Sequence, residues 1–352
     1  MQSAPSSPNV NRRVVLAARP RGEPVPSDFR LEEMPIPEIR QNQVLLQTMY
    51  LSLDPYMRGL MNETTAENYA PPLPLGAVMP GGTVSRVASS SHPDFGEGDL
   101  VASNSGWQEY QAAGTRGLER LERDMAHPSY AVGVLGMTGF TAYHGLLRMT
   151  DPQPGETVAL AAATGAVGAV VGQLAKMRGC RVVGLAGSQA KIDYAEGTLG
   201  YDVCINRRDA DMALQVAAAC PDGIDVYFEN VGGPIFDAVL PHMNLRSRIP
   251  ICGLIAHYNE GGLPSGPNRL PLFQMAVLTS RIMVKGFIIS DHYFESGVDN
   301  RPVFRSELTR FIDEGHIDVK EDITDGLENA PETFIGMLNG ENFGKTLIRV
   351  AD

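Results

Sequence analysis

A glycine-rich turn offers the clearest chemistry in the sequence. Residues 162–168 read AATGAVG and follow an apolar run that begins at Thr157. Such a turn, placed between a strand and a helix, brings backbone amides close to a pyrophosphate, and the helix N-terminus adds partial positive charge. Ala162 stands where the G-x-G-x-x-G pattern has its first glycine, so the heptad alone fits a Gly/Ala-rich packing helix equally well. The strands predicted around it favour a dinucleotide-binding turn.

The residues after the next predicted strand indicate which dinucleotide would bind. The run 181–186 is followed by GSQAK, which holds no Asp or Glu where an NAD-binding turn carries a carboxylate for the ribose 2′-hydroxyl. Lys191 can pair with a 2′-phosphate, and Ser188, beside Gly187, can hydrogen-bond it. We therefore expect NADPH rather than NADH, with a solvated helix residue as the alternative interpretation of Lys191.

Cysteine and histidine placement argues against a catalytic zinc ion. The first 179 residues contain no cysteine, and His92, His127 and His144 have no second ligand at metal spacing. Each is expected to be a packing or surface histidine. The cysteines form no C-x-x-C pair, which predicts reduced thiols in a cytosolic protein. They are Cys180, Cys204, Cys220 and Cys252.

The elements that must position these residues fall into two patterns. From Arg13 to about Ala113 short β-like runs are broken by Pro and Gly, which predicts an irregular all-β domain. From about Val132 apolar strands alternate with helical patterns, which is typical of βαβ units on a parallel, doubly wound nucleotide-binding sheet. The strands of this second part are expected at 157–162, 181–186, 202–205, 224–229, 248–252 and 282–287.

These patterns predict two domains. Residues 1–132 and 315–352 would form the catalytic domain, and residues 133–314 a Rossmann domain. Residues 1–12 are expected to be a disordered tail rather than a signal peptide, because they are rich in Ser, Pro and Asn. The Gly/Pro-rich segment 258–271 is expected to be a mobile flap over a site. The final GKTLIRV is expected to be a strand that pairs with the first domain.

Charge and hydropathy exclude some partners. The net charge of -12 disfavours nucleic acid, because a phosphate backbone would be repelled. Residues 158–175 carry no charge, but Ala and Gly dominate them and would weaken a membrane span. We therefore expect a cytoplasmic protein with a small-molecule substrate and neither a nucleic-acid nor a membrane partner.

Long segments throughout the chain resemble one known family. The chain is similar, from about Arg13 to Val350, to the zinc-free branch of the medium-chain dehydrogenases/reductases. That branch contains the leukotriene hydroxydehydrogenase/prostaglandin reductases, the plant double-bond reductases and the bacterial NADPH-dependent curcumin reductases. The matching segments are LSLDPYMRG from Leu51, GVLGMTGFTAYHGLL from Gly133, AAATGAVGAVVGQLAK from Ala161, DVYFENVGGPIFDAVLP from Asp225, ICGLIAHYN from Ile251, GFIIS from Gly286, ITDGLENAPETFIGML from Ile323 and NFGKTLIRV from Asn342.

The resemblance implies an α/β fold made of a GroES-like, partly open β-barrel domain and a Rossmann domain, in a homodimer. It also implies a set of NADPH contacts. Arg207 takes the place of a tyrosine that touches the 2′-phosphate in many relatives, and its guanidinium could bind that phosphate bidentately. The implied contacts are Gly165, Ala166, Val167, Gly168, Gly187, Ser188, Lys191, Arg207, Asn230, Cys252, Gly253, Tyr258, Phe287, Ile288, Ile289 and Asn342.

The implied activity is reduction of the carbon–carbon double bond of α,β-unsaturated ketones and aldehydes, such as curcumin-like enones and alkenals. Without a metal, a hydrogen-bond donor must face the enolate oxygen that develops as hydride reaches the β-carbon. Tyr56 and Tyr258 match tyrosines at the family's active site, although from sequence alone a tyrosine beside proline more often packs a turn. Water or the nicotinamide ribose hydroxyl could instead relay the proton.

Three questions stay open at the level of sequence. A quinone reductase of the same superfamily would use the same NADPH site, and a non-catalytic NADPH-binding redox sensor would keep only the fold. His257 replaces the small Ser or Thr common in relatives, and it could narrow the pocket, add a donor or point to solvent. The physiological substrate is not indicated, because enones share one reacting group and differ in parts read by pocket shape.

Overall fold

A computed structural model describes residues 10–260 and 267–351 of the chain. The chain divides into two compact units. Unit 1 comprises Met1–Gly133, Tyr258–Gly261 and Glu321–Asp352, and unit 2 comprises Val134–His257 and Gly262–Lys320. Residues 261–266 of the predicted flap 258–271 lie outside the described residues.

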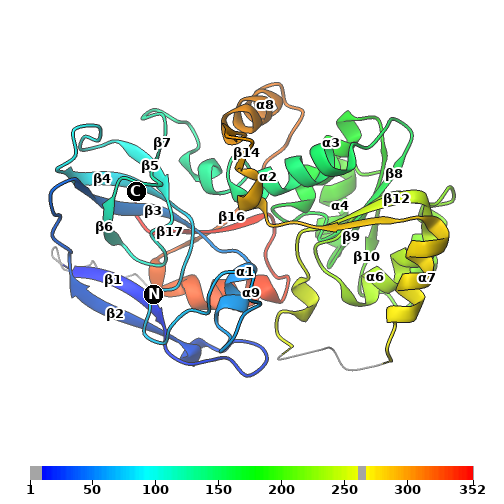
Figure 1. The fold of residues 1–352 in the computed structure, drawn as a ribbon, viewed down its shortest axis with the longest axis horizontal. Coiled ribbons are helices and arrows are strands. Elements are labelled where there is room, and N and C mark those ends of the chain that lie inside the picture. The colour runs from blue at the N-terminus through cyan, green and yellow to red at the C-terminus, as the bar shows by residue number, and fades with distance from the viewer. Residues whose placement is uncertain (1–9, 261–266, 352) are drawn as a thin grey trace. The chain divides into compact units, whose positions relative to one another are not determined.

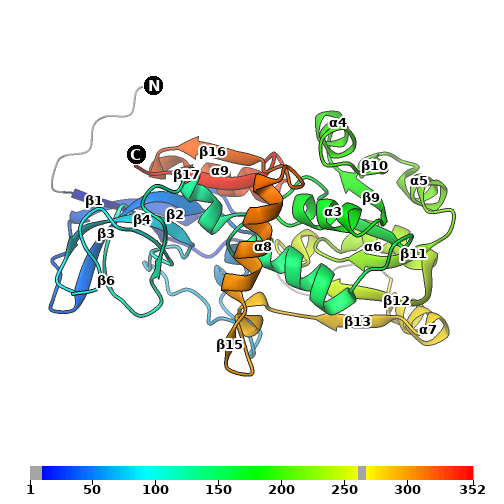
Figure 2. The same ribbon diagram turned by 90° about the horizontal axis from the view of Figure 1, so that it is seen from above.

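Unit 1 is built around one seven-stranded sheet of order β16-β17-β3-β4-β5-β7, with β6 also paired to β3, and a separate hairpin of β1 and β2. The predicted C-terminal strand is confirmed, because β17 pairs antiparallel with β3. Figure 2 shows β16 and β17, near the C-terminus, alongside the N-terminal strands of the same unit. The elements are β1 Val10–Leu16, β2 Phe29–Pro35, β3 Gln43–Ser52, α1 Tyr56–Leu60, β4 Thr83–Ser90, β5 Leu100–Ser103, β6 Tyr110–Gly114, β7 Glu119–Arg120, β16 Glu321–Asp325, α9 Ala330–Leu338 and β17 Lys345–Arg349.

The ordered chain begins earlier than the predicted tail allows. Residues 10–12 belong to β1 and pair with β2, so the prediction that they are disordered is wrong; residues 1–9 lie outside the described residues. The reason is a set of polar contacts made by Asn11 and Arg12, which the Ser-, Pro- and Asn-rich composition of this segment does not indicate. The Asn11 side chain is buried and exchanges hydrogen bonds of 3.0 and 2.9 Å with the backbone of Tyr110, and Arg12 forms an ion pair with Glu109 at 2.7 Å.

Unit 2 carries a six-stranded parallel sheet of order β10-β9-β8-β11-β12-β13, drawn in green to yellow in Figure 1. The chain starts in the middle at β8, moves to one edge, and then crosses to the other half, which is the doubly wound order of nucleotide-binding sheets. All six predicted strands are present, and β9 has its predicted bounds. The elements are α2 Met137–Tyr143, β8 Thr157–Ala161, α3 Gly168–Met177, β9 Arg181–Ala186, α4 Gln189–Gly197, β10 Val203–Asn206, α5 Met212–Ala219, β11 Ile224–Phe228, α6 Gly233–Val239, β12 Met243–Ile251, α7 Leu270–Ser280, β13 Met283–Gly286, β14 Phe294–Glu295, β15 Val298–Asp299 and α8 Arg301–Asp313.

The core of unit 2 is formed where helices cover this sheet. Apolar residues of α5, α6 and α7 pack against Val183, Leu185 and Ile249 of the strands in one continuous cluster. Helix α3 buries Val171 and Leu174, as its apolar spacing predicted. The uncharged stretch 158–175 is therefore a strand, a turn and a helix, and no helix within the described residues is long and apolar enough to cross a membrane.

Candidate functional site: a dinucleotide turn and two tyrosines

The glycine-rich turn joins β8 to α3 at the carboxyl end of the sheet, where doubly wound folds bind ligands. Ala162, at the first motif position, adopts a left-handed backbone with φ 49°, which usually favours glycine. A Cβ at Gly168 would lie 2.3 Å from the Ala162 carbonyl oxygen, so only glycine fits there. Gly165 donates its N–H to that same oxygen at 2.9 Å. The turn thus has the close packing that pyrophosphate binding requires, despite the alanine.

A buried tyrosine braces this turn. The Tyr201 hydroxyl lies 3.1 Å from the Ala163 carbonyl oxygen and 2.9 Å from that of Gly168, and it donates to both. Its ring occupies the space that a side chain on Gly172 or Gly184 would need, with a Cβ at 2.3 or 2.7 Å. Complete burial raises the pKa of Tyr201 well above the usual value, so the hydroxyl remains a donor. Gly172 and Gly184 therefore make room for the Tyr201 ring, whereas Gly168 packs on the backbone of the turn itself.

Cationic and hydroxyl groups gather at the end of β9. Gly187 and Ser188 follow this strand, and Ser188 precedes α4 without using its side chain as a cap. The guanidinium of Arg207, which follows β10, lies against Gly187, since a Cβ there would be 3.3 Å from Nε. Burial, reinforced by Arg208, lowers the pKa of Arg207. Lys191 lies in the first turn of α4, half-buried.

The predicted contacts on the other half of the sheet also lie at strand ends. Asn230 follows β11, and its Oδ1 is buried without a hydrogen-bond partner among the described residues. Glu229 holds the turn by accepting the N–H groups of Val231 and Gly232 at 2.8 Å, while its Oε2 has no partner in the described chain. Burial raises the pKa of Glu229. The side-chain oxygens Asn230 Oδ1 and Glu229 Oε2 thus have no hydrogen-bond donor among the described residues.

The next two strands of the sheet, β12 and β13, end in the remaining predicted contacts. Cys252 donates its N–H to the Glu229 carbonyl oxygen at 3.0 Å, and burial raises the pKa of its thiol to about 12. Gly253 comes next and is half-buried. Phe287 and Ile289 are buried, whereas Ile288 is 42% exposed. The predicted dinucleotide contacts within unit 2 are therefore all at or just beyond the carboxyl ends of its parallel strands.

His257 lies over the Asn-Val-Gly-Gly turn. A Cβ at Gly232 would be 3.0 Å from its ring, so the ring packs on the turn rather than extending into solvent. This contact argues against the alternative that His257 points to solvent; that it narrows the pocket or adds a donor stays a prediction.

The two candidate catalytic tyrosines both belong to unit 1. Tyr56 is the first residue of α1, and Tyr258 lies in the short segment 258–261. Arg58 ties these places together: Nε donates to Asn259 Oδ1 at 3.0 Å, and the same guanidinium donates to Gly22 and Asn62. Arg58 is 1% exposed, and burial lowers its pKa. These contacts fix the position of Asn259, next to Tyr258, and could not be predicted from the sequence.

The predicted contact Asn342 also lies in unit 1. Its Nδ2 donates to the Gly344 carbonyl oxygen at 2.9 Å, which shapes the turn before β17. This hydrogen bond is local and stabilises the turn before β17. The NADPH contact of Asn342 stays a prediction.

The histidines considered for zinc have different surroundings. His127 stacks on Tyr130 and His92 packs against Phe95, as expected of packing histidines. His144 is buried in unit 2, and its pKa falls to about 4 because of burial and of His292 beside it. The cysteines are unpaired thiols, as predicted, and burial raises the pKa of Cys204 to about 12.

Comparison with known proteins places this arrangement in a family. Residues 12–121 match the model described as "N-terminal domain of oxidoreductase", and residues 166–300 match the one described as "Zinc-binding dehydrogenase". The chain is 53% identical over 341 residues to the NADPH-dependent curcumin reductase of Escherichia coli, covering 97% of each chain. The chain belongs to the medium-chain dehydrogenases/reductases.

Further relatives refine this membership. The chain is 38% identical over 350 residues to the NADP(+)-dependent 2-alkenal reductase of Nicotiana tabacum, covering 97% of this chain and 98% of the relative. The crystal structure of CurA from Vibrio vulnificus in complex with NADPH matches with a TM-score of 0.92 at 47% identity, covering 97% of this chain and 99% of that one. The family resemblance and the α/β fold class with a Rossmann domain, both expected from the sequence, are confirmed.

Proposed function

We propose that the protein reduces the carbon–carbon double bond of α,β-unsaturated ketones and aldehydes with NADPH. The observation that carries this proposal is its near-complete alignment, at 53% identity, with an NADPH-dependent curcumin reductase. The site supports it, because the glycine turn joins β8 to α3 at the carboxyl end of the sheet and the Arg207 guanidinium lies at Gly187 beside Ser188. The close relationship favours this activity over quinone reduction and over a non-catalytic sensor.

In unit 2 the chain would bind and orient the cofactor. The turn Gly165–Gly168, braced by Tyr201, would line the pyrophosphate, and the amides of Ala166, Val167 and Gly168 would donate to it. Arg207 and Lys191 would neutralise the 2′-phosphate, for which a guanidinium offers two parallel hydrogen bonds. The unpartnered buried acceptor of Asn230 would take a hydrogen bond from a ribose hydroxyl or the carboxamide. Bound NADPH supplies the hydride that goes to the substrate β-carbon.

In unit 1 the chain would stabilise the reacting oxygen. A phenol is a neutral donor whose hydrogen bond strengthens as negative charge appears on the enolate oxygen. We assign this donation to Tyr258, with Tyr56 as the second candidate. Arg58 would position the two tyrosines, because its guanidinium holds Asn259, which is next to Tyr258, and because Arg58 lies two residues from Tyr56.

Steady-state kinetics with two cofactors and two acceptors test this proposal. The purified protein is assayed with NADPH and separately NADH, using curcumin and a short linear enone. We expect turnover with NADPH and a saturated-ketone product. In Arg207→Ala the preference for NADPH over NADH is expected to fall by 10-fold or more, which corresponds to about 1.4 kcal/mol or more. Tight NADPH binding without turnover on either acceptor would favour the non-enzymatic alternative.

Three further properties form part of the proposal. Catalysis would be zinc-independent, because the first 179 residues contain no cysteine; chelator treatment should leave turnover intact. The protein would be a homodimer, which light scattering after gel filtration measures. It would act in the cytoplasm, consistent with its unpaired thiols; fractionation of cells of the source organism tests this.

A further inference from the structure

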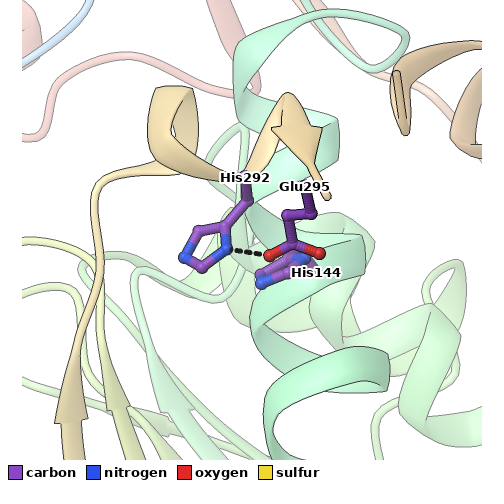
Figure 3. A group of neighbouring side chains, drawn as sticks. All are labelled: His144, His292 and Glu295. Atoms are coloured by element: carbon purple, nitrogen blue, oxygen red, sulfur yellow. Dashed lines mark hydrogen bonds and ion pairs between the residues drawn. The ribbon is translucent and has the colours of Figure 1, made fainter. Parts of the chain in front are cut away.

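Two histidines and a glutamate meet in unit 2. His144 begins a π-helical turn, His144–Thr150, that continues α2, and π-helical turns occur often at functional sites. His292 ends a 3-10 turn, Ile289–His292, and Glu295 lies in the β14–β15 hairpin. Figure 3 shows the three side chains converging from these separate elements. Their potential ligand atoms all lie within 4.8 Å of one another.

The three groups differ in burial in a way that suits a site at the surface. His144 is 6% exposed, the His292 side chain 18% and the Glu295 side chain 48%. The two imidazole rings have centroids 4.0 Å apart, and His292 Nδ1 lies 2.6 Å from Glu295 Oε1. An ion could therefore enter from the exposed glutamate side. The buried histidine would form the floor of the site.

A neighbouring side chain orients the ligands. Asn300 Nδ2 donates to the His292 carbonyl oxygen at 3.0 Å and to Glu295 Oε2 at 3.2 Å. It thereby holds the carboxylate with Oε1 toward the histidines. Phe140 and Phe287 pack on the His144 ring from other directions and limit its rotation. Ligands fixed by such outer contacts are typical of built metal sites.

We propose that His144, His292 and Glu295 bind one divalent first-row transition-metal ion, with zinc as the best match. Two imidazole nitrogens and one carboxylate oxygen form a ligand set that zinc accepts in proteins, with water in the fourth tetrahedral position. In this proposal the ion has no part in hydride transfer. The inference rests on side chains within unit 2 and does not depend on the NADPH assignment.

The bound ion joins the π-helical turn to the hairpin. These segments are far apart in sequence, and among the ligands only His292 and Glu295 contact each other through a hydrogen bond. The ion forms one bond to each of the three ligands, and these bonds link His292 and β14 to the π-helical turn that begins at His144. Because the ion binds the folded state alone, it raises the thermal stability of unit 2, and above Kd this gain grows with the logarithm of the free metal concentration.

Metal titration of the whole protein tests this inference. The protein is prepared without a polyhistidine tag, treated with chelator and freed of it. Co²⁺ is then added while visible absorption is recorded, and Zn²⁺ binding is measured by calorimetry. We expect one ion per chain, the d–d bands of four-coordinate cobalt and a rise in Tm. A sulfur-to-cobalt charge-transfer band would overturn the proposal, because it would place the ion on a cysteine.

Three variants separate this site from chance binding. His292→Ala, which removes a partly exposed ligand, is expected to abolish saturable binding. Asn300→Ala should weaken it by about 10- to 100-fold, the usual cost of losing an outer contact. The control is His316→Ala, because His316 pairs with Glu314 at 3.6 Å on the surface and would bind adventitious metal equally. Circular dichroism checks that each variant is folded. Binding that survives His292→Ala, or that disappears in His316→Ala, would refute the site.

Discussion

Tyr201→Phe tests whether the bracing tyrosine holds the dinucleotide turn. The change keeps the ring that fills the space beside Gly172 and Gly184, and it removes only the hydroxyl that donates to the carbonyl oxygens of Ala163 and Gly168. Both acceptors would then lie in the core without that donor. We therefore expect a loosened turn in a protein that still folds.

The expected magnitude follows from the hydrogen bonds. A neutral intramolecular hydrogen bond contributes about 0.5–1.5 kcal/mol, and leaving a buried acceptor unsatisfied costs about 1–3 kcal/mol of folding stability. Binding must restore the turn geometry, so we assign about 1 kcal/mol of that cost to NADPH affinity, which corresponds to about fivefold weaker Kd. Turnover at saturating cofactor should change little, because the hydroxyl touches no reacting atom.

Fluorescence titration of NADPH and urea unfolding measure these two effects. The matched control is Tyr143→Phe, which removes a buried hydroxyl that donates to Glu307 at 2.5 Å in the same unit but away from the turn. The control should lose stability and keep its NADPH Kd. An unchanged Kd in Tyr201→Phe, with the expected loss of stability, would refute the bracing role.

Three more changes have expected outcomes. Gly168→Ala should abolish measurable NADPH binding in the same titration, because the new Cβ would lie 2.3 Å from a backbone oxygen of the turn. Lys345→Met should lower the free energy of unfolding by about 3–5 kcal/mol, because it leaves the buried Asp54 carboxylate without its cation at 2.8 Å; adding Asp54→Asn should recover part of the loss. A hydrogen bond from Arg248 lowers the pKa of Glu156. The contribution of the Glu156 carboxylate to stability is therefore present above pH 4.5 and is lost as the pH falls through the lowered pKa. Urea unfolding of Glu156→Gln should show a flatter dependence of stability on pH below pH 4.5.

Much of the Rossmann unit could be predicted because its strands are buried on both faces. Such strands appear in the sequence as short apolar runs bounded by glycine, and 181–186 was found with its exact bounds. The strand predicted to begin at Arg248 begins at Met243 instead. Residues 244–246 are polar or exposed, so they hide the strand start from a search for apolar runs.

The side-chain constellations could not be predicted in the same way. Arg58 and Asn259 meet across a long sequence separation, as do His144 and His292, and local spacing carries no signal for either pair. Tyr201 is separated from the turn that it braces by two helices and a strand, α3, β9 and α4. Glycine at positions 172 and 184 was the available signal in the sequence, because the lack of a side chain at both places leaves room for a large ring.

Deuterium transfer tests the central claim most directly. NADPH labelled with deuterium at both C4 positions is incubated with the protein and a short linear enone, and the product is examined by NMR and mass spectrometry. The account predicts a saturated ketone that carries one deuterium on the β-carbon. An allylic alcohol with deuterium on the former carbonyl carbon, or no transfer to any enone, would contradict it.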